Sequence, residues 1–231
     1  MALTFYIENG VLESFSHTSK KDVKSIIIPE GVVRINQFYG YGGNIKSIIL
    51  PQSLKTIGRA ALSSMGINNI DIPRSVDNIE EGAFACNRKL KEVTVPDKVM
   101  TISDGLFASC YKLKKVSLPD NVTCIGELAF MNCKRLKCID LPNNLISICK
   151  CAFSGCEKLE DVIIPAGVKN IADGAFAQCY KLKSITIPKS VEEIGDYVFE
   201  NCKKVVIYTP SGSCAESYAK RNKIPFVTTN I

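Results

Sequence analysis

Prolines recur at an almost constant interval along most of this chain, and this repeat constrains the fold more than any other feature. Eight of them are separated by 22, 22 and then five times 23 residues: Pro29, Pro51, Pro73, Pro96, Pro119, Pro142, Pro165 and Pro188. A fixed period of this length is typical of a solenoid, in which each unit buries its apolar side only by stacking on its neighbours. The interval therefore predicts a stack of similar coils.

The fully developed unit reads A-F-x-x-C-x-x-L-x-x-[VI]-x-[IL]-P-x-x-[VL]-x-x-I, as in the copy at residues 175–194. Alternating apolar residues before the proline predict a short strand with one face inward. Proline lacks an N–H and should end that strand. Val191 and Ile194 predict a second, shorter extended side, and Ala175-Phe176 a third, with the ring at the centre of the coil. Glycine at one of two corner positions, as at Gly82 or Gly126, should relieve the bend.

The two ends of the chain follow different patterns. Thr4 to Ile7 and Val11 to Phe15 are β-prone runs around Asn9-Gly10, which favours the positive φ values of a tight hairpin turn. Residues 211–222 predict a short helix with Ser213 as its N-cap, and residues 225–227 a final strand.

These patterns together predict one continuous domain. We expect a capping hairpin at residues 1–22, an array of about eight coils at residues 23–210, and a C-terminal helix and strand cap at residues 211–231. Polar or covered ends are what a solenoid requires.

The repeat resembles that of the BspA-like leucine-rich-repeat proteins, also called the Treponema pallidum type. Residues 113–133 (LKKVSLPDNVTCIGELAFMNC) and 159–179 (LEDVIIPAGVKNIADGAFAQC) carry the motif, and the similarity covers roughly residues 20–226. The resemblance implies an α/β repeat solenoid, specifically a right-handed leucine-rich-repeat superhelix with short parallel strands. It also implies a binding function without enzymatic activity, in a family that includes bacterial surface adhesins.

Departures from the repeat are concentrated in the early coils. Gly40 and Leu62 stand in the phenylalanine column, and both coils lack the repeated cysteine. Tyr39 and Tyr41 lie on the same glycine-rich corner. Exposed aromatic residues are favoured anchors at interfaces, so these tyrosines are candidate partner-binding residues. The alternative is a locally repacked corner in which Phe38 supplies the missing ring.

Basic residues form columns on either side of the repeated leucine. The position before leucine holds Lys89, Lys112, Arg135, Lys158, Lys181 and Lys204, and the position after it holds Lys24, Lys46, Lys91, Lys114, Lys137 and Lys183. We call these two columns the basic ridge. Their summed potential predicts docking of an acidic protein or an anionic glycan. The alternative is a solvated lysine ladder that opposes aggregation.

Nucleic acid is a disfavoured partner for this ridge. Binding of single strands usually combines basic residues with aromatic rings on which bases stack. Only Tyr111 and Tyr180 neighbour the lysines. The outward strand column that includes Ile49, Asp71 and Ile163 is mixed in character and gives no uniform ligand groove.

Eleven cysteines raise the question of chemistry at a thiol. Five of them, Cys110, Cys133, Cys156, Cys179 and Cys202, are spaced by 23 residues, and Asn87 stands in the same column. We interpret this column as buried packing thiols without disulfides.

The other cysteines suggest no catalytic or metal centre. The spacing of Cys124, Cys149 and Cys151 is compatible with a cluster of three thiolates, but the sequence has no C-x-x-C pair and a single histidine, His17. A zinc site typically needs four ligands and a cysteine nucleophile needs a base. We therefore expect no cofactor, no metal and no enzymatic activity.

Composition restricts the location and the function of the protein less than the repeat restricts its fold. The 231 residues carry a net charge of +6, ordinary for a protein with a large core. The start at Met1 to Ile7 does not have the pattern of a secretory signal, and no apolar run is long enough for a membrane span. Together with the large and odd number of cysteines, these features favour a location in the cytoplasm. The alternative is the cell surface or the exterior, if a signal has been removed. The predicted function is a non-enzymatic interaction module; the alternative is an adhesin that binds host extracellular-matrix protein.

Overall fold

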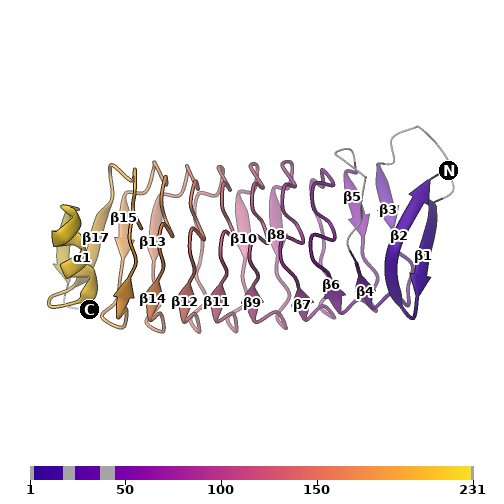
Figure 1. Cartoon of the computed structure of the whole chain (residues 1–231), viewed down its shortest axis with the longest axis horizontal. Helices are drawn as coiled ribbons and strands as arrows, with labels where there is room; N and C mark the ends of the chain where they lie inside the picture. Colours follow the sequence, from indigo (N-terminus) through magenta and orange to yellow (C-terminus); the bar gives the residue numbers. More distant parts are fainter. Residues whose placement is uncertain (1–2, 18–23, 37–44, 230–231) are drawn as a thin grey trace.

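The computed structural model describes residues 3–17, 24–36 and 45–229, which form an elongated solenoid of about nine turns (Figure 1). The coils lie side by side along one axis. The hairpin of β1 (Leu3–Glu8) and β2 (Val11–His17) stands at one end and the helix α1 (Cys214–Asn222) at the other. The predicted solenoid with its two caps is confirmed, and α1 is the only α-helix among the described residues.

Short strands before six of the eight repeated prolines, continued by two strands near the C-terminus, form the first side of the solenoid. These strands are parallel and in register in three groups: β3 (Ser25–Ile27) with β5 (Ser47–Ile49); β8 (Glu92–Thr94) with β10 (Lys115–Ser117); and β13 (Asp161–Ile163), β15 (Ser184–Thr186), β17 (Val206–Pro210) and β18 (Phe226–Thr229). The middle residue of each repeat strand, such as Val93 opposite Val116, is buried. The predicted alternation is therefore observed.

Two-residue strands form the second side, as Val191 and Ile194 predicted. They make two parallel sheets: β4 (Arg34–Ile35), β6 (Thr56–Ile57) and β7 (Asn78–Ile79); and β9 (Thr101–Ile102), β11 (Cys124–Ile125), β12 (Ser147–Ile148), β14 (Asn170–Ile171) and β16 (Glu193–Ile194). The antiparallel hairpin of β1 (Leu3–Glu8) and β2 (Val11–His17) extends the first of these sheets through pairing of β2 with β4. It covers the first coil with Leu12 and Phe15, which are buried.

The third side carries a continuous stack of phenylalanine rings. Six rings follow one another with centroid separations of 5.1 to 6.0 Å and interplanar angles of 5 to 19°: Phe84, Phe107, Phe130, Phe153, Phe176 and Phe199. All six are buried, as is Leu62 in the same column. Because offset stacking adds to the burial of each ring, this column ties every coil to the next.

The cysteine column satisfies backbone groups at the neighbouring corner. Each thiol donates to the carbonyl of the phenylalanine one coil earlier, as Cys133 Sγ does to Phe107 O at 3.3 Å. Asn87 makes four hydrogen bonds there: its Nδ2 donates to Leu62 O and Phe84 O, and its Oδ1 accepts from the N–H groups of Gly66 and Ile67.

Glycine serves two distinct purposes at the corner. Gly82, like Gly105 and Gly174, has a φ near +60°, a region that costs other residues about 1–2 kcal/mol. The same position is occupied at a similar φ by Ala60, Leu128, Cys151 and Tyr197. Gly126 has an ordinary φ but would clash with the backbone and side chain of Asp104 if it carried a Cβ. One glycine position is thus required by conformation and the other by space.

The C-terminal cap closes the stack. Helix α1 (Cys214–Asn222) begins at Ser213, whose side chain accepts a hydrogen bond from Glu216 N. Tyr218 packs edge-on against Phe199, the last ring of the stack, and its hydroxyl accepts from Val198 N at 3.1 Å. The predicted N-cap and the predicted final strand are both observed.

Asn87 should be the least replaceable residue of the cysteine–asparagine column. Asn87→Ala removes four hydrogen bonds and leaves Leu62 O and the N–H groups of Gly66 and Ile67 without that partner, whereas Phe84 O keeps the Cys110 thiol. Each unpaired buried group costs about 1–3 kcal/mol. We expect it to lower the free energy of unfolding by about 3 kcal/mol or more, measured by urea denaturation. Cys133→Ala, which loses one weak S–H···O bond and little volume, should cost about 1–2 kcal/mol. Equal costs would contradict this account of the column.

The left-handed corner position predicts opposite effects for two substitutions. Gly82→Ala should destabilise the fold by roughly 1 kcal/mol, because its φ is +61° although the nearest atom to an added Cβ is 3.8 Å away. Tyr197→Gly should stabilise it by up to about 1 kcal/mol, because Tyr197 has a φ of 56° and its side chain is 71% exposed. Denaturant midpoints of the two variants measure both effects. A stabilising Gly82→Ala would refute the conformational explanation.

Candidate interaction surfaces

Stacking turns the predicted basic columns into a surface. All twelve residues of the basic ridge are exposed. They flank the buried leucine that precedes each strand, so the ridge runs along one border of the strand side. Parallel neighbours repeat about every 4.8 Å along the stack. The candidate partner-binding lysines and Arg135 are therefore brought together in two lines, as their spacing predicted.

The column before leucine remains electrostatically unpaired. Within the part of the chain that the structure describes, no ion pair involves Lys89, Lys112, Arg135, Lys158, Lys181 or Lys204. Six consecutive coils thus present a free cation at the same position. The charge of this column is available to an external anion.

The column after leucine is partly neutralised by Glu160. Lys137 and Lys183, one coil to either side, place their Nζ atoms 3.7 and 3.1 Å from its carboxylate oxygens. The hydrogen bond from Lys183 and the charges of both lysines lower the pKa of Glu160. Sequence reasoning missed this interruption of the ridge. Scanning for opposite charges 23 residues apart would have found it.

Aromatic rings near the ridge have different surroundings. Tyr111 lies under two cations, with Arg88 Cζ 5.4 Å and Lys134 Nζ 5.8 Å from its ring centroid. Tyr180 is 49% exposed and is the more accessible ring. The candidate residues Tyr39 and Tyr41 lie outside the described residues, so their role remains a prediction.

Acidic residues lie on another corner, where several serve the fold. Asp104 Oδ1 accepts from Glu127 N at 2.7 Å, and Asp173 Oδ1 accepts from Asp196 N at 2.8 Å. These carboxylates bind the backbone of the next coil. They are structural as well as surface charges, which makes this corner a weaker candidate for partner binding.

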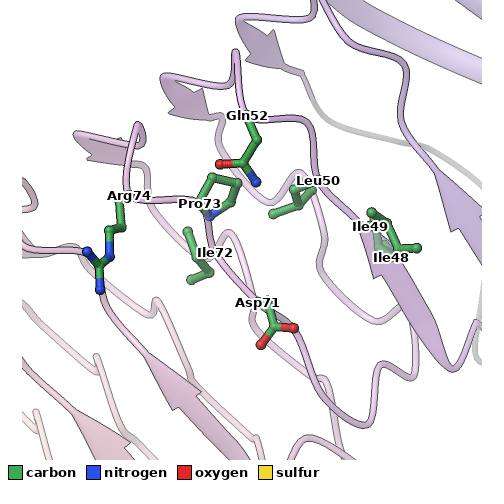
Figure 2. A pocket seen from close by; sticks show the side chains of 8 residues that line it. All are labelled: Ile48, Ile49, Leu50, Gln52, Asp71, Ile72, Pro73 and Arg74. Carbon is green, nitrogen blue, oxygen red and sulfur yellow. The ribbon is translucent and has the colours of Figure 1, made fainter.

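The strand side contains a cavity where the parallel ladder is interrupted (Figure 2). No strand is assigned at residues 70–72 or 139–141 of the described chain, the two coils with an aspartate, Asp71 or Asp140, at the outward position. Aspartate is disfavoured in strands. Beside β5 an open cavity of about 460 Å³ results, with an apolar lining that includes Ile49 and Ile72 and with Asp71 and Arg74 at its border. The repeat pattern does not predict this cavity.

The cysteines are all free thiols in two classes. The five cysteines of the repeated column are buried, and burial raises the pKa of Cys110 to about 12. The other six are at least partly exposed. Among these, Cys124 and Cys149 lie with their Sγ atoms 3.7 Å apart, whereas no such contact is described for Cys151. The described residues contain no group of three or more His, Cys, Asp or Glu side chains arranged to hold a metal ion.

The sequence and the architecture are similar to those of known leucine-rich-repeat proteins. A sequence model of the BspA-type leucine-rich-repeat region matches residues 12–137 and 100–216, with six copies. No curated protein gives a significant match. No described helix has the length and apolar character to cross a membrane.

Several solved structures are similar to this chain over most of its length. A leucine-rich repeat protein from Bacteroides ovatus is 26% identical with a TM-score of 0.70, over 90% of this chain and 69% of that one. A leucine-rich cell surface protein from Faecalibacterium prausnitzii is 28% identical with a TM-score of 0.59, over 86% and 62%. The leucine-rich repeat protein of T. pallidum is 28% identical with a TM-score of 0.56, over 75% and 72%.

Thiol accessibility gives a direct test of the cysteine arrangement. In the folded protein, a thiol reagent such as an aromatic disulfide should modify Cys138, which is exposed, before any other cysteine. Cys110, Cys133, Cys156, Cys179 and Cys202 should react only after denaturation, because they are buried, and burial also raises the pKa of the first three thiols. Mass spectrometry of digests taken over time measures both. Early modification of the buried five would contradict the structure.

Proposed function

This chain belongs to the BspA-type leucine-rich-repeat family, whose sequence model matches well over half of it, and we propose that it is a non-enzymatic protein-interaction module that binds an acidic partner along the basic ridge. The family and the fold are consistent with protein interaction in general. The choice of surface and of partner charge is the specific part of the proposal.

One observation carries this choice: six consecutive coils present an exposed cation for which no intramolecular ion pair is described. At about 4.8 Å per coil, the column from Lys89 to Lys204 extends over roughly 24 Å. Like charges held at this spacing repel one another, so an acidic surface that spans several coils relieves the repulsion. Such complementarity mainly accelerates association and selects the partner.

Tyr180 and the neighbouring strand side supply apolar anchor groups, which the charged residues of the ridge do not provide. Specific interfaces combine electrostatic steering with a few buried anchors, commonly aromatic or aliphatic. Tyr180 is 49% exposed and Ile163 is 72% exposed. Both project from coils that carry the ridge, so one partner can cover the cations and these apolar groups together.

The absence of enzymatic activity is part of the proposal. Among the described residues, burial raises the pKa of cysteines such as Cys110, and no group of three or more metal-ligating side chains is found. The exposed surface carries basic residues repeated in successive coils, together with isolated isoleucines such as Ile49 and Ile163. These features support binding over catalysis.

A second candidate is a cell-surface adhesin that binds host extracellular-matrix protein. The observation that favours it is the 28% identity with a solved structure described as a leucine-rich cell surface protein. The odd number of cysteines favours instead a reducing compartment and an intracellular scaffold. If the protein binds immobilised matrix proteins and this binding depends on the ridge, the adhesin is supported. If it does not bind matrix proteins but binds an intracellular protein, the scaffold is supported.

Charge reversal in the ridge tests the main proposal. The variant Lys112→Glu/Arg135→Glu/Lys158→Glu should lose partner binding at least about tenfold, because three adjacent attractive contacts become repulsive. Affinity capture with the intact protein under reducing conditions, quantified by mass spectrometry, identifies the ligand, and titration at rising salt should weaken binding by the wild type.

A matched control separates local charge from net charge. The variant Lys55→Glu/Lys98→Glu/Lys189→Glu changes three exposed lysines elsewhere on the coils. Each triple variant shifts the net charge from +6 to 0, since three residues each change by −2. The control should bind like the wild type. A ridge variant that folds, as judged by circular dichroism, and keeps full affinity would remove the ridge from consideration.

A further inference from the structure

Two cysteines outside the repeated column meet on the side of the two-residue strands. Cys124 lies in β11, and Cys149 directly follows β12 in the next coil. Their Sγ atoms are 3.7 Å apart, and both side chains are half-buried. Neither contributes to the buried core. Packing therefore does not explain why two thiols face each other here.

Strand register determines which bridge could join the two thiols. Cys124 is opposite Ser147 and Ile125 is opposite Ile148, so Cys149 is displaced by two residues along the neighbouring strand. A lateral step of about 4.8 Å and two rises of about 3.3 Å separate such Cα atoms by about 8 Å. A disulfide rarely spans more than about 7 Å between Cα atoms. A direct S–S bond would thus require the backbone to move.

A single bridging atom fits this spacing without such movement. In a tetrahedral centre with Zn–S bonds of about 2.3 Å, two thiolates lie about 3.8 Å apart. The observed separation is 3.7 Å. We propose that Cys124 and Cys149 form a two-thiol binding site for one thiophilic divalent cation, of the zinc and cadmium type. Water supplies the remaining ligands, because no described group offers three protein ligands.

The surroundings of the pair favour a cation. Gly126 lies in the coil between Asp104 and Cys149, and the Asp104 carboxylate occupies the space where a side chain at Gly126 would stand. Asp104 is close enough to Cys149 to contribute to the raised pKa of its thiol, although burial is the larger cause. The negative charge of this nearby carboxylate stabilises a bound cation electrostatically.

Access to the site is open. A cavity of about 410 Å³ adjoins Cys149, with Ser147, Asp173 and Glu193 among its lining residues. Ala172 and Gly195 follow Cys149 in the same column, and their small size leaves this cavity open. Hydrated ions can therefore reach the Cys149 thiol through an entrance that carries Lys150 as well as the acidic Asp173 and Glu193.

Titration with Cd²⁺ tests the site, with the charge-transfer absorption of Cd–thiolate bonds as the signal. The protein is reduced with a phosphine, so that no competing thiol is present. We expect one Cd²⁺ per folded chain, bound at least about tenfold more weakly by C124S and by C149S. Both variants should fold, because serine already stands opposite Cys124, at Ser147, and in the column of Cys149 two coils earlier, at Ser103. D104N should weaken binding without changing the stoichiometry.

Two controls complete the design. C138S removes an exposed thiol on the strand side and C151S removes the third neighbouring cysteine; both should retain the bound Cd²⁺. Undiminished binding by C124S/C149S would overturn the proposal, as would loss of binding in C151S. Ready formation of a disulfide between Cys124 and Cys149 on treatment with diamide, detected by peptide mapping of the folded protein, would overturn the spacing argument and identify an oxidisable pair.

Discussion

Stacking of each coil on the next is the interaction on which this structure depends, and the phenylalanine column is its centre. A coil of 23 residues has too few apolar groups to form a core by itself. When six rings stack at 5.1 to 6.0 Å, each coil supplies the surface that its neighbour buries. The hairpin at one end and Tyr218 at the other are needed because the first and last coils lack one neighbour.

The same stacking creates the candidate binding surfaces. A residue type repeated every 23 positions becomes a line on the molecule, because the coils are in register. Lys112 and Lys158 are 46 residues apart in sequence but only two coils apart in space. An interruption is equally local: Glu160 affects the lysines of the coils on either side, and Asp71 opens a cavity beside one strand.

The features that repeat once per coil could be predicted from the sequence. Contacts between residues whose separation differs from the repeat length could not be assigned in detail. The phenylalanine and cysteine columns follow directly from their spacing, as do the ridge and the place of Asn87 in the cysteine column. Proximity of Cys124, Cys149 and Cys151 could be anticipated from sequence, but not that the contact at 3.7 Å is made by Cys149 with Cys124. The left-handed φ of Leu128 and Tyr197 also escaped prediction, because neither residue type signals that conformation. The stacked neighbours impose it.

Regular packing restricts where specificity can reside. A uniform column of cations attracts many acidic surfaces, since potential falls off smoothly and carries little information on shape. Discrimination between partners must come from positions that differ between coils: Glu160, the ring of Tyr180, and the cavity between Ile49 and Ile72. All three lie on or beside the strand side that the ridge borders. A partner that reads these departures from the repeat, while the ridge accelerates its approach, would be bound selectively by a scaffold whose every coil is otherwise alike.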